Sequence, residues 1–376
     1  MENNNDNKVL NVPPLRFPEF SGEWDSFKLV ELGKFIGGGT PSSSNLSFWT
    51  GSIPWISSSD IKEDNINNIS ISRYITEEAI EKSATKYCPA PVILIVSRVG
   101  VGKVALSHTS LCTSQDFCNI IEIKCHPVFL SYNLLRTMKR KSREVQGTSI
   151  KGITSDELQK MRVFIPKNKD EQNKISNLLT LLDERIATQN KIIEKLQSLI
   201  KGLAVALTTK EKANIAISQC LECHSSTLQE SEVLSSGLCK VFGANGLVGY
   251  KDVPQMNGDA ILVIKDGSGV GTVSYAQGKF SVIGTLNYLT VIGNNDLRYL
   301  YFALSVFNFQ PYKTGMAIPH IYFKDYGKAK IYCPSLAEQK RVANVLDKLE
   351  SKLFVEQELL ASFNQQKLYL LGKMFI

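Results

Sequence analysis

The sequence predicts an α+β protein built as a tandem repeat, in which two globular domains are separated by an antiparallel two-helix coiled coil with pseudo-two-fold symmetry. Three observations support this fold. Two long stretches of heptad-spaced apolar residues lie 167 positions apart (Ile175 matches Val342), each follows a run of short strands, and the strand-rich regions match each other at nearly the same offset. Short strands mixed with few helices are typical of α+β domains.

The two long helices are expected at residues 167–208 and 335–376. Apolar residues alternate at spacings of three and four, which indicates a coiled-coil seam. The single polar break in the first series, Gln189, is matched by Glu356 in the second. Two unrelated core helices would give a similar pattern, but a helix of about 38 residues spans about 57 Å, longer than ordinary core helices. The predicted seam consists of Leu179, Leu182, Ile186, Ile193, Leu196, Leu346, Leu349, Leu353, Leu360 and Phe363.

The globular domains are expected at residues 16–166 and 209–334, after a polar, disordered tail at 1–15. Residues 93–96 match 261–264, and residues 163–166 match 331–334, as expected for a repeat. The first helix leaves domain one and ends at domain two, so pairing must carry the second helix back toward domain one. The helix pair is therefore expected to be antiparallel.

Composition narrows the classes of protein. The net charge of +7 suits a polyanionic partner. No apolar run reaches the roughly 18 residues that a transmembrane helix needs, and the polar N-terminus lacks the apolar core of a signal peptide. We therefore expect a cytoplasmic protein with no membrane partner, whose eight cysteines are free thiols.

Several motifs carry a resemblance to a known family. Residues 17–24 read Phe-Pro-Glu-Phe-Ser-Gly-Glu-Trp, both long helices start with a proline followed by Glu-Gln at 166–172 and 334–339, and Gly-Thr-Ser-Ile stands at 147–150. With these motifs the chain resembles the specificity subunit of type I restriction-modification systems over essentially its whole length. Residues 241–250 also resemble the opening of one class of recognition domain in this family. Domain two lacks the tryptophan-containing opening, and its start is placed near Asn214.

The resemblance implies a non-catalytic subunit. Two target-recognition domains would each read one half of a bipartite site in double-stranded DNA, and the helices would dock two modification (methyltransferase) subunits, which a restriction (motor-nuclease) subunit joins. No cofactor or metal is expected on this chain, because S-adenosylmethionine, ATP and magnesium would belong to those partners. The helices would then set the spacing of two half-sites, roughly 34–36 Å apart or a multiple of it.

DNA contacts are expected from loops in which Lys or Arg stands beside Ser, Thr or Asn, since cations bind phosphates and bidentate groups read base edges. Apolar residues that fall outside the seam are expected to bind the modification subunits. The partner-binding candidates are Leu181, Ile192 and Leu359. The DNA-binding candidates are Ser57, Ser59, Asp60, Arg98, Lys103, Thr148, Ser149, Lys151, Asn245, Lys265, Lys279, Lys313 and His320.

Other motifs suggest enzymes. Cys220, Cys223 and His224 match a haem-attachment pattern, which would require export, so we interpret them as ordinary thiols. Residues 97–104 lack the first glycine and the Ser/Thr of a phosphate loop. Glu122 and Lys124 share one face of a strand, as in metal-dependent nucleases. The main alternative is therefore a self-sufficient DNA-cleaving enzyme built on the same tandem reader, and a third is a coiled-coil protein without DNA affinity.

Overall fold

The computed structural model describes residues 10–145 and 152–376. These form two compact units: residues up to Thr188 together with Leu360–Ile376, and residues Gln189–Leu359. The division cuts both long helices. Among the described residues, no helix is long and apolar enough to cross a membrane.

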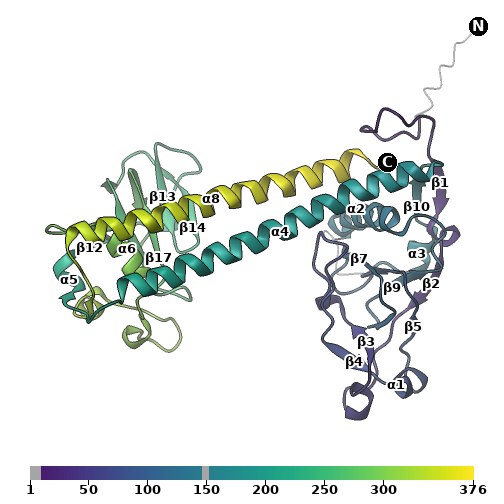
Figure 1. Cartoon of the computed structure of the whole chain (residues 1–376), viewed down its shortest axis with the longest axis horizontal. Coiled ribbons are helices and arrows are strands. Elements are labelled where there is room, and N and C mark those ends of the chain that lie inside the picture. Colours follow the sequence, from purple (N-terminus) through teal and green to yellow (C-terminus); the bar gives the residue numbers. More distant parts are fainter. Residues whose placement is uncertain (1–9, 146–151) are drawn as a thin grey trace, which may run out of the picture. The chain divides into compact units, whose positions relative to one another are not determined.

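The first unit contains three small sheets, which Figure 1 shows beside the helix α2 (Pro127–Val145). Its short helices are α1 (Glu77–Glu81) and α3 (Ser155–Lys160). In spatial order, the sheets are β1 (Asp25–Lys28) and β10 (Arg162–Ile165); β2 (Lys34–Gly37), β9 (Cys118–Ile121), β6 (Val92–Ile95) and β7 (Val104–Ser107); and β4 (Arg73–Ile75), β3 (Ile53–Ile56), β8 (Leu111–Thr113) and β5 (Tyr87–Cys88).

The second unit repeats this plan strand for strand. Its short helices are α5 (Ile217–Cys220), α6 (Leu297–Ser305) and α7 (Phe323–Tyr326). Its sheets, in spatial order, are β11 (Ile215–Ala216) and β20 (Lys330–Ile331); β12 (Leu221–Ser225), β19 (Leu286–Val291), β16 (Ala260–Ile264) and β17 (Val273–Ala276); and β14 (Gly246–Lys251), β13 (Cys239–Gly243), β18 (Lys279–Val282) and β15 (Met256–Asn257).

Each strand of the first unit therefore corresponds to the strand of the second unit whose number is higher by ten, so that β1 matches β11 and β10 matches β20. The equivalence includes the only parallel pairs among the described strands, β3 with β8 and β13 with β18. The tandem repeat expected from the sequence is confirmed at the level of topology.

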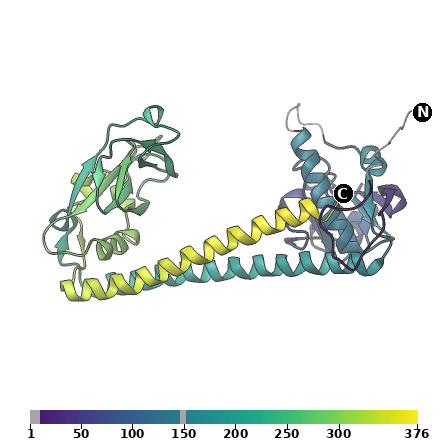
Figure 2. The same ribbon diagram turned by 90° about the horizontal axis from the view of Figure 1, so that it is seen from above.

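The long helices α4 (Lys169–Thr208) and α8 (Leu336–Lys373) pair in antiparallel fashion within each unit (Figures 1 and 2). In the first unit, Ile175 and Leu179 share a core with Leu371. In the second unit, Ala204 shares a core with Leu346. The coiled coil is thus confirmed, and it is open to solvent along its sides: Leu179, Leu182, Ile193 and Leu346 are buried, whereas Ile186, Leu196, Leu349, Leu353, Leu360 and Phe363 are half-buried.

The matched polar break in the two heptad series is a direct contact. The side-chain amide of Gln189 donates to the backbone carbonyl of Glu356 at 2.9 Å, and Gln189 is only 5% exposed. The same amide also donates to the side-chain carboxylate of Glu356 at 2.5 Å. A buried polar pair at one seam position favours one register over its neighbours.

The Glu-Gln motif at the start of α4 has a structural role. The fully buried carboxylate of Glu171 accepts hydrogen bonds from Arg16 at 2.7 Å and from the Trp24 indole at 3.2 Å. The Gln172 amide donates to Pro166 O at 2.9 Å. In the second unit, Gln339 donates to Pro334 O in the same way. The tryptophan-containing opening therefore supplies hydrogen-bond donors to the buried Glu171 carboxylate. In the second unit the corresponding Glu338 is half-buried and reaches solvent, so it does not need such donors.

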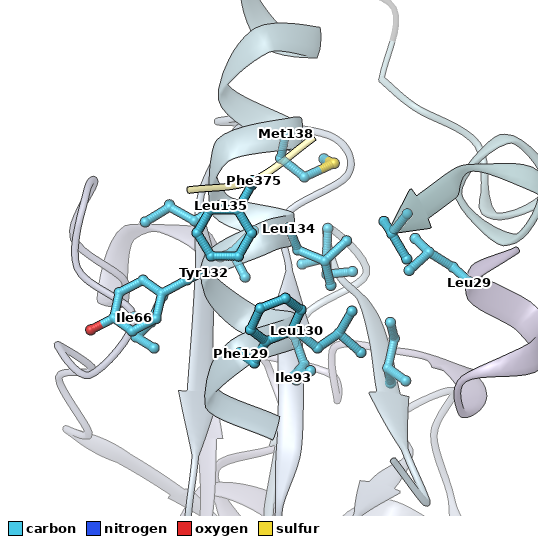
Figure 3. Close-up of a cluster of buried hydrophobic side chains, with 14 of the residues drawn as sticks. Leu29, Ile66, Ile93, Phe129, Leu130, Tyr132, Leu134, Leu135, Met138 and Phe375 are labelled. Atoms are coloured by element: carbon cyan, nitrogen blue, oxygen red, sulfur yellow. The ribbon is translucent and has the colours of Figure 1, made fainter. Parts of the chain in front are cut away.

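The first unit's core includes the end of α8. Figure 3 shows Phe375 among side chains of α2, including Phe129 and Met138. The Phe375 ring also meets the Trp24 ring edge-on at 6.4 Å. Of the expected tail, residues 1–9 lie outside the described residues. Residues 10–15 differ from the expectation, because Leu15 N donates to Lys373 O at 2.9 Å and Leu15 packs on this core.

Candidate nucleic-acid interface

Both units build the same loop after the central strand of one four-stranded sheet. In the first unit, Val96 N donates to Lys103 O, and Ile153 N donates to Ser97 O at 2.8 Å. In the second unit, Ile264 N donates to Thr272 O, and Ile321 N donates to Lys265 O at 2.9 Å. The β6–β7 and β16–β17 loops are thus each held by a later segment of the chain. Arg98, Lys103 and Lys265, three of the DNA-binding candidates, lie on these two loops. His320 and Lys313 lie on the later segment that holds the β16–β17 loop.

The β6–β7 loop contacts a second predicted loop. Lys103 Nζ donates to Ser58 O at 3.1 Å, which brings Lys103 beside the turn at 57–60. Within that turn the Asp60 carboxylate accepts the Ser57 amide proton at 2.7 Å and pairs with Arg73, whose guanidinium lies 4.6 Å from the centre of the Trp55 ring. The carboxylate of Asp60 is therefore committed to the fold, while Ser59 is exposed.

Arg98 is exposed on the β6–β7 loop, and the described part of the chain provides no partner for its guanidinium. It lines an open cavity of about 800 Å³ together with Gly38, Gln115 and Thr154. Gly152 passes so close that a Cβ on it would lie 2.5 Å from Ser97 O, so only glycine fits there. The candidates Thr148, Ser149 and Lys151 lie outside the described residues.

Sequence reasoning missed a basic helix end beside this loop. Residues 139–143 of α2 read Lys-Arg-Lys-Ser-Arg. A Cβ on Gly102 would lie 3.1 Å from Ser142 Cβ, which places this helix end against the β6–β7 loop. Lys139 pairs with Asp64 at 2.6 Å, whereas Arg140 and Arg143 are exposed. Cations near a helix C-terminus can simply stabilise the helix. Four cations within five residues nevertheless make this helix end a candidate phosphate-binding face.

In the second unit the structure brings Lys265, Lys313 and His320 together. His320 Nδ1 lies 2.7 Å from Asp266 Oδ1, and Lys265 Nζ lies 3.7 Å from Asp266 Oδ2. Thr314, which follows Lys313, exchanges two backbone hydrogen bonds with His320, at 2.9 and 2.7 Å. The carboxylate of Asp266 therefore lies between the imidazole of His320 and the ammonium group of Lys265, and Lys313 precedes the residue that is hydrogen-bonded to His320.

Asn245 and Lys279 lie apart from each other. Asn245 is exposed in the hairpin that joins β13 to β14, and Lys279 is the first residue of β18. Because β13 and β18 are parallel, the end of one strand and the start of the other lie at opposite ends of the sheet.

The residues of the enzyme-like motifs make contacts that belong to the packing of the fold. Cys220 is buried, and His224 stacks on Tyr288 with ring centres 4.8 Å apart while its Nε2 lies 2.9 Å from the Thr290 hydroxyl. Glu122 is exposed after β9 and pairs with Lys34 at 3.4 Å. Among the described residues, no group of three or more His, Cys, Asp or Glu side chains is arranged to hold a metal ion.

The partner-binding candidates lie on the exposed sides of the long helices. Leu181 and Ile192 on α4 are 61% and 36% exposed, and Leu359 on α8 is 40% exposed. They are predictions that the structure leaves open, as are the DNA-binding candidates.

The sequence model of one family, the type I restriction modification DNA specificity domain, matches residues 21–198 and again 224–365. The chain belongs to this family. The two matches coincide with the two halves of the strand-for-strand repeat, so the family's domain occurs twice in this specificity-domain protein.

Known relatives agree with this assignment. The MjaIX specificity subunit of Methanocaldococcus jannaschii is 34% identical over 186 residues, which cover 46% of this chain and 42% of that protein. The EcoR124I/EcoR124II specificity subunit of Escherichia coli is 35% identical over 177 residues, 45% of this chain and 43% of that protein. The chain thus matches less than half the length of each relative. The crystal structure of the S subunit from M. genitalium has a similar fold, with a TM-score of 0.67 at 19% identity, covering 97% of this chain and 99% of that one.

Proposed function

We propose that the chain is the DNA-reading subunit of a type I restriction-modification complex and recognises a bipartite site with its two repeated units. The observation that carries this proposal is the repeated loop construction: the loop after the equivalent strand carries cations in both units, Arg98 and Lys103 on the β6–β7 loop and Lys265 on the β16–β17 loop, with Lys313 on the later segment that holds this second loop. Cations in such loops bind phosphates and guanine edges.

The long helices would have two roles in this function. A continuous helix of 40 residues is about 60 Å long, enough to separate half-sites by one or more turns of B-DNA. Its exposed leucines would dock two modification subunits, and a restriction subunit would join that complex. Methyl transfer and cleavage would then belong to those partners, which would bring S-adenosylmethionine, ATP and magnesium, and this chain would act in the cytoplasm without catalysing a reaction.

The test is to express the chain with its modification partner in a strain that lacks other methylation and to sequence the methylated sites. We expect one bipartite motif with a fixed number of unread base pairs. A continuous motif, or none, would contradict the proposal. The purified chain incubated with magnesium and DNA is the control, because cleavage without added subunits would instead support the self-sufficient nuclease.

A further inference from the structure

The second unit carries an exposed apolar turn at residues 315–319, which read Gly-Met-Ala-Ile-Pro. Met316 is fully exposed and Ile318 is 58% exposed. No other large apolar side chain among the described residues is as exposed as Met316. Exposure of an apolar tip to water costs free energy, which is recovered when a partner covers the tip.

The turn is held in place at its base. Thr314 and His320 exchange two backbone hydrogen bonds, and Gly267 N donates to Pro319 O at 3.0 Å. Gly315 has φ = +88°, and a Cβ there would lie 2.3 Å from Ile318 O, so the turn needs glycine at this position. The His320 ring is fixed by Asp266. The apolar side chains are therefore presented on a preorganised support, which lowers the entropic cost of inserting them into a partner.

Positively charged residues flank this tip. Lys313 and Lys324 flank the turn in the sequence, with no acidic residue between them. Lys324 Nζ lies 5.3 Å from the centre of the Tyr322 ring, and Lys265 lies on the neighbouring loop. The carboxylate of Asp266 is already shared between His320 and Lys265. An apolar tip flanked by cations matches a polyanion with an apolar interior, which describes the stacked bases of duplex DNA between their phosphates.

We propose that Met316, with Ile318 beside it, is an apolar wedge that inserts between two stacked base pairs of the half-site read by the second unit. Methionine, isoleucine and proline are among the side chains that architectural proteins use to unstack a base step from the groove. The flanking lysines would hold the phosphates on either side of the opened step. This inference rests on the proposed DNA-reading function and adds a mechanism, since a flexible pyrimidine–purine step would be favoured at a position that no side chain reads by hydrogen bonds.

The experiment uses the full chain in complex with its modification partner and a duplex carrying its mapped site. 2-Aminopurine replaces adenine at successive steps of the second unit's half-site, because its fluorescence rises several-fold when stacking is lost. We expect this rise at one step with the unaltered chain. The double variant Met316→Ala with Ile318→Ala should abolish the rise and weaken binding about tenfold, equivalent to about 1.4 kcal/mol. Both residues are exposed, so the fold should tolerate these changes.

The matched control is Val253→Ala, which removes another exposed apolar side chain of the same unit. It should keep both the fluorescence rise and the affinity. A rise that survives in the double variant, or no rise at any step, would overturn the wedge. A loss of affinity limited to sites with one particular thymine, and copied by replacing that thymine with uracil, would also overturn it in favour of a methyl contact. Absence of any site-specific binding by the unaltered complex would instead refute the proposed function.

Discussion

Lys367 occupies a heptad position of α8 where an apolar residue is expected, and its replacement offers a sharp test of how the first unit is held together. Its ammonium group pairs with the Asp183 carboxylate of α4, and the two side chains are 5% and 3% exposed. It also donates to Asp64 O. The Tyr132 hydroxyl on α2 donates to Asp183 at 2.8 Å. Burial, and then the charge of Asp183, raise the pKa of Tyr132. One buried cluster thus joins α2, α4 and α8.

Lys367→Met keeps an unbranched apolar stem but removes the cation, so Asp183 remains buried without its counter-ion. Removing one partner of a buried ion pair costs about 3–5 kcal/mol, whereas replacing both partners with apolar residues is close to neutral. With a urea m-value of about 2 kcal/mol/M, the midpoint of unfolding of the first unit should fall by about 1.5–2.5 M. The double variant Lys367→Met with Asp183→Leu should recover most of this loss.

The chain provides its own probe. Its three tryptophans, Trp24, Trp49 and Trp55, all lie in the first unit, so tryptophan fluorescence during urea unfolding follows that unit. Arg298→Met is the control, because it removes a paired cation from the second unit, where Arg298 on α6 pairs with Glu350 on α8 at 2.7 Å. That variant should leave the tryptophan transition unchanged. A loss below about 1 kcal/mol for Lys367→Met, the size of a surface pair, would refute the reasoning.

Four further outcomes are expected. Arg98→Ala should weaken binding by about 1–3 kcal/mol and relax one base position, measured by methylation sequencing; a uniform loss over all sequences would assign Arg98 to phosphate. Adding one heptad to α4 between Ile186 and Leu196, with a matching heptad beside Glu356, lengthens the pair by about 10.5 Å and should add about three unread base pairs; an unchanged spacer would contradict the ruler. Leu181→Glu with Ile192→Glu should abolish co-purification with the modification subunit, whereas the exposed Leu238→Glu, outside the helices, should not. The hydrogen bond from Cys220 lowers the pKa of Cys333, and burial raises the pKa of Cys112 to about 12, so mass spectrometry after alkylation of the native chain near pH 7.5 should find Cys333 modified before Cys112.

The sequence predicted the features that repeat or depend on local periodicity. The heptad spacing placed α4 and α8, and the 167-residue offset revealed the tandem domains. The same offset matched the polar positions Gln189 and Glu356, and the structure shows these two residues in contact. These features are encoded over short stretches, so neighbouring residues suffice to recognise them.

Features that depend on distant residues could not be predicted. Glu171 is recognisable as part of a motif, but its partner Arg16 stands 155 residues away. Lys367 interrupted the apolar pattern, and only the fold shows that Asp183 faces it. The same limit applies to the candidate interface. Lys103 and Ser58 come together through the packing of separate sheets. The basic end of α2 could be assigned to this interface only after the structure placed Gly102 of the β6–β7 loop against Ser142.

The way two acidic residues of the long helices are neutralised has a consequence for biosynthesis. Glu350 finds its cation, Arg298, within the contiguous stretch Gln189–Leu359, whereas Asp183 waits for Lys367, 184 residues further along. At about 5–20 residues per second, a ribosome needs roughly 10–40 s to supply that lysine. The half of the molecule that is translated first is therefore completed last, and during this interval its unfinished core is exposed to chaperones and proteases.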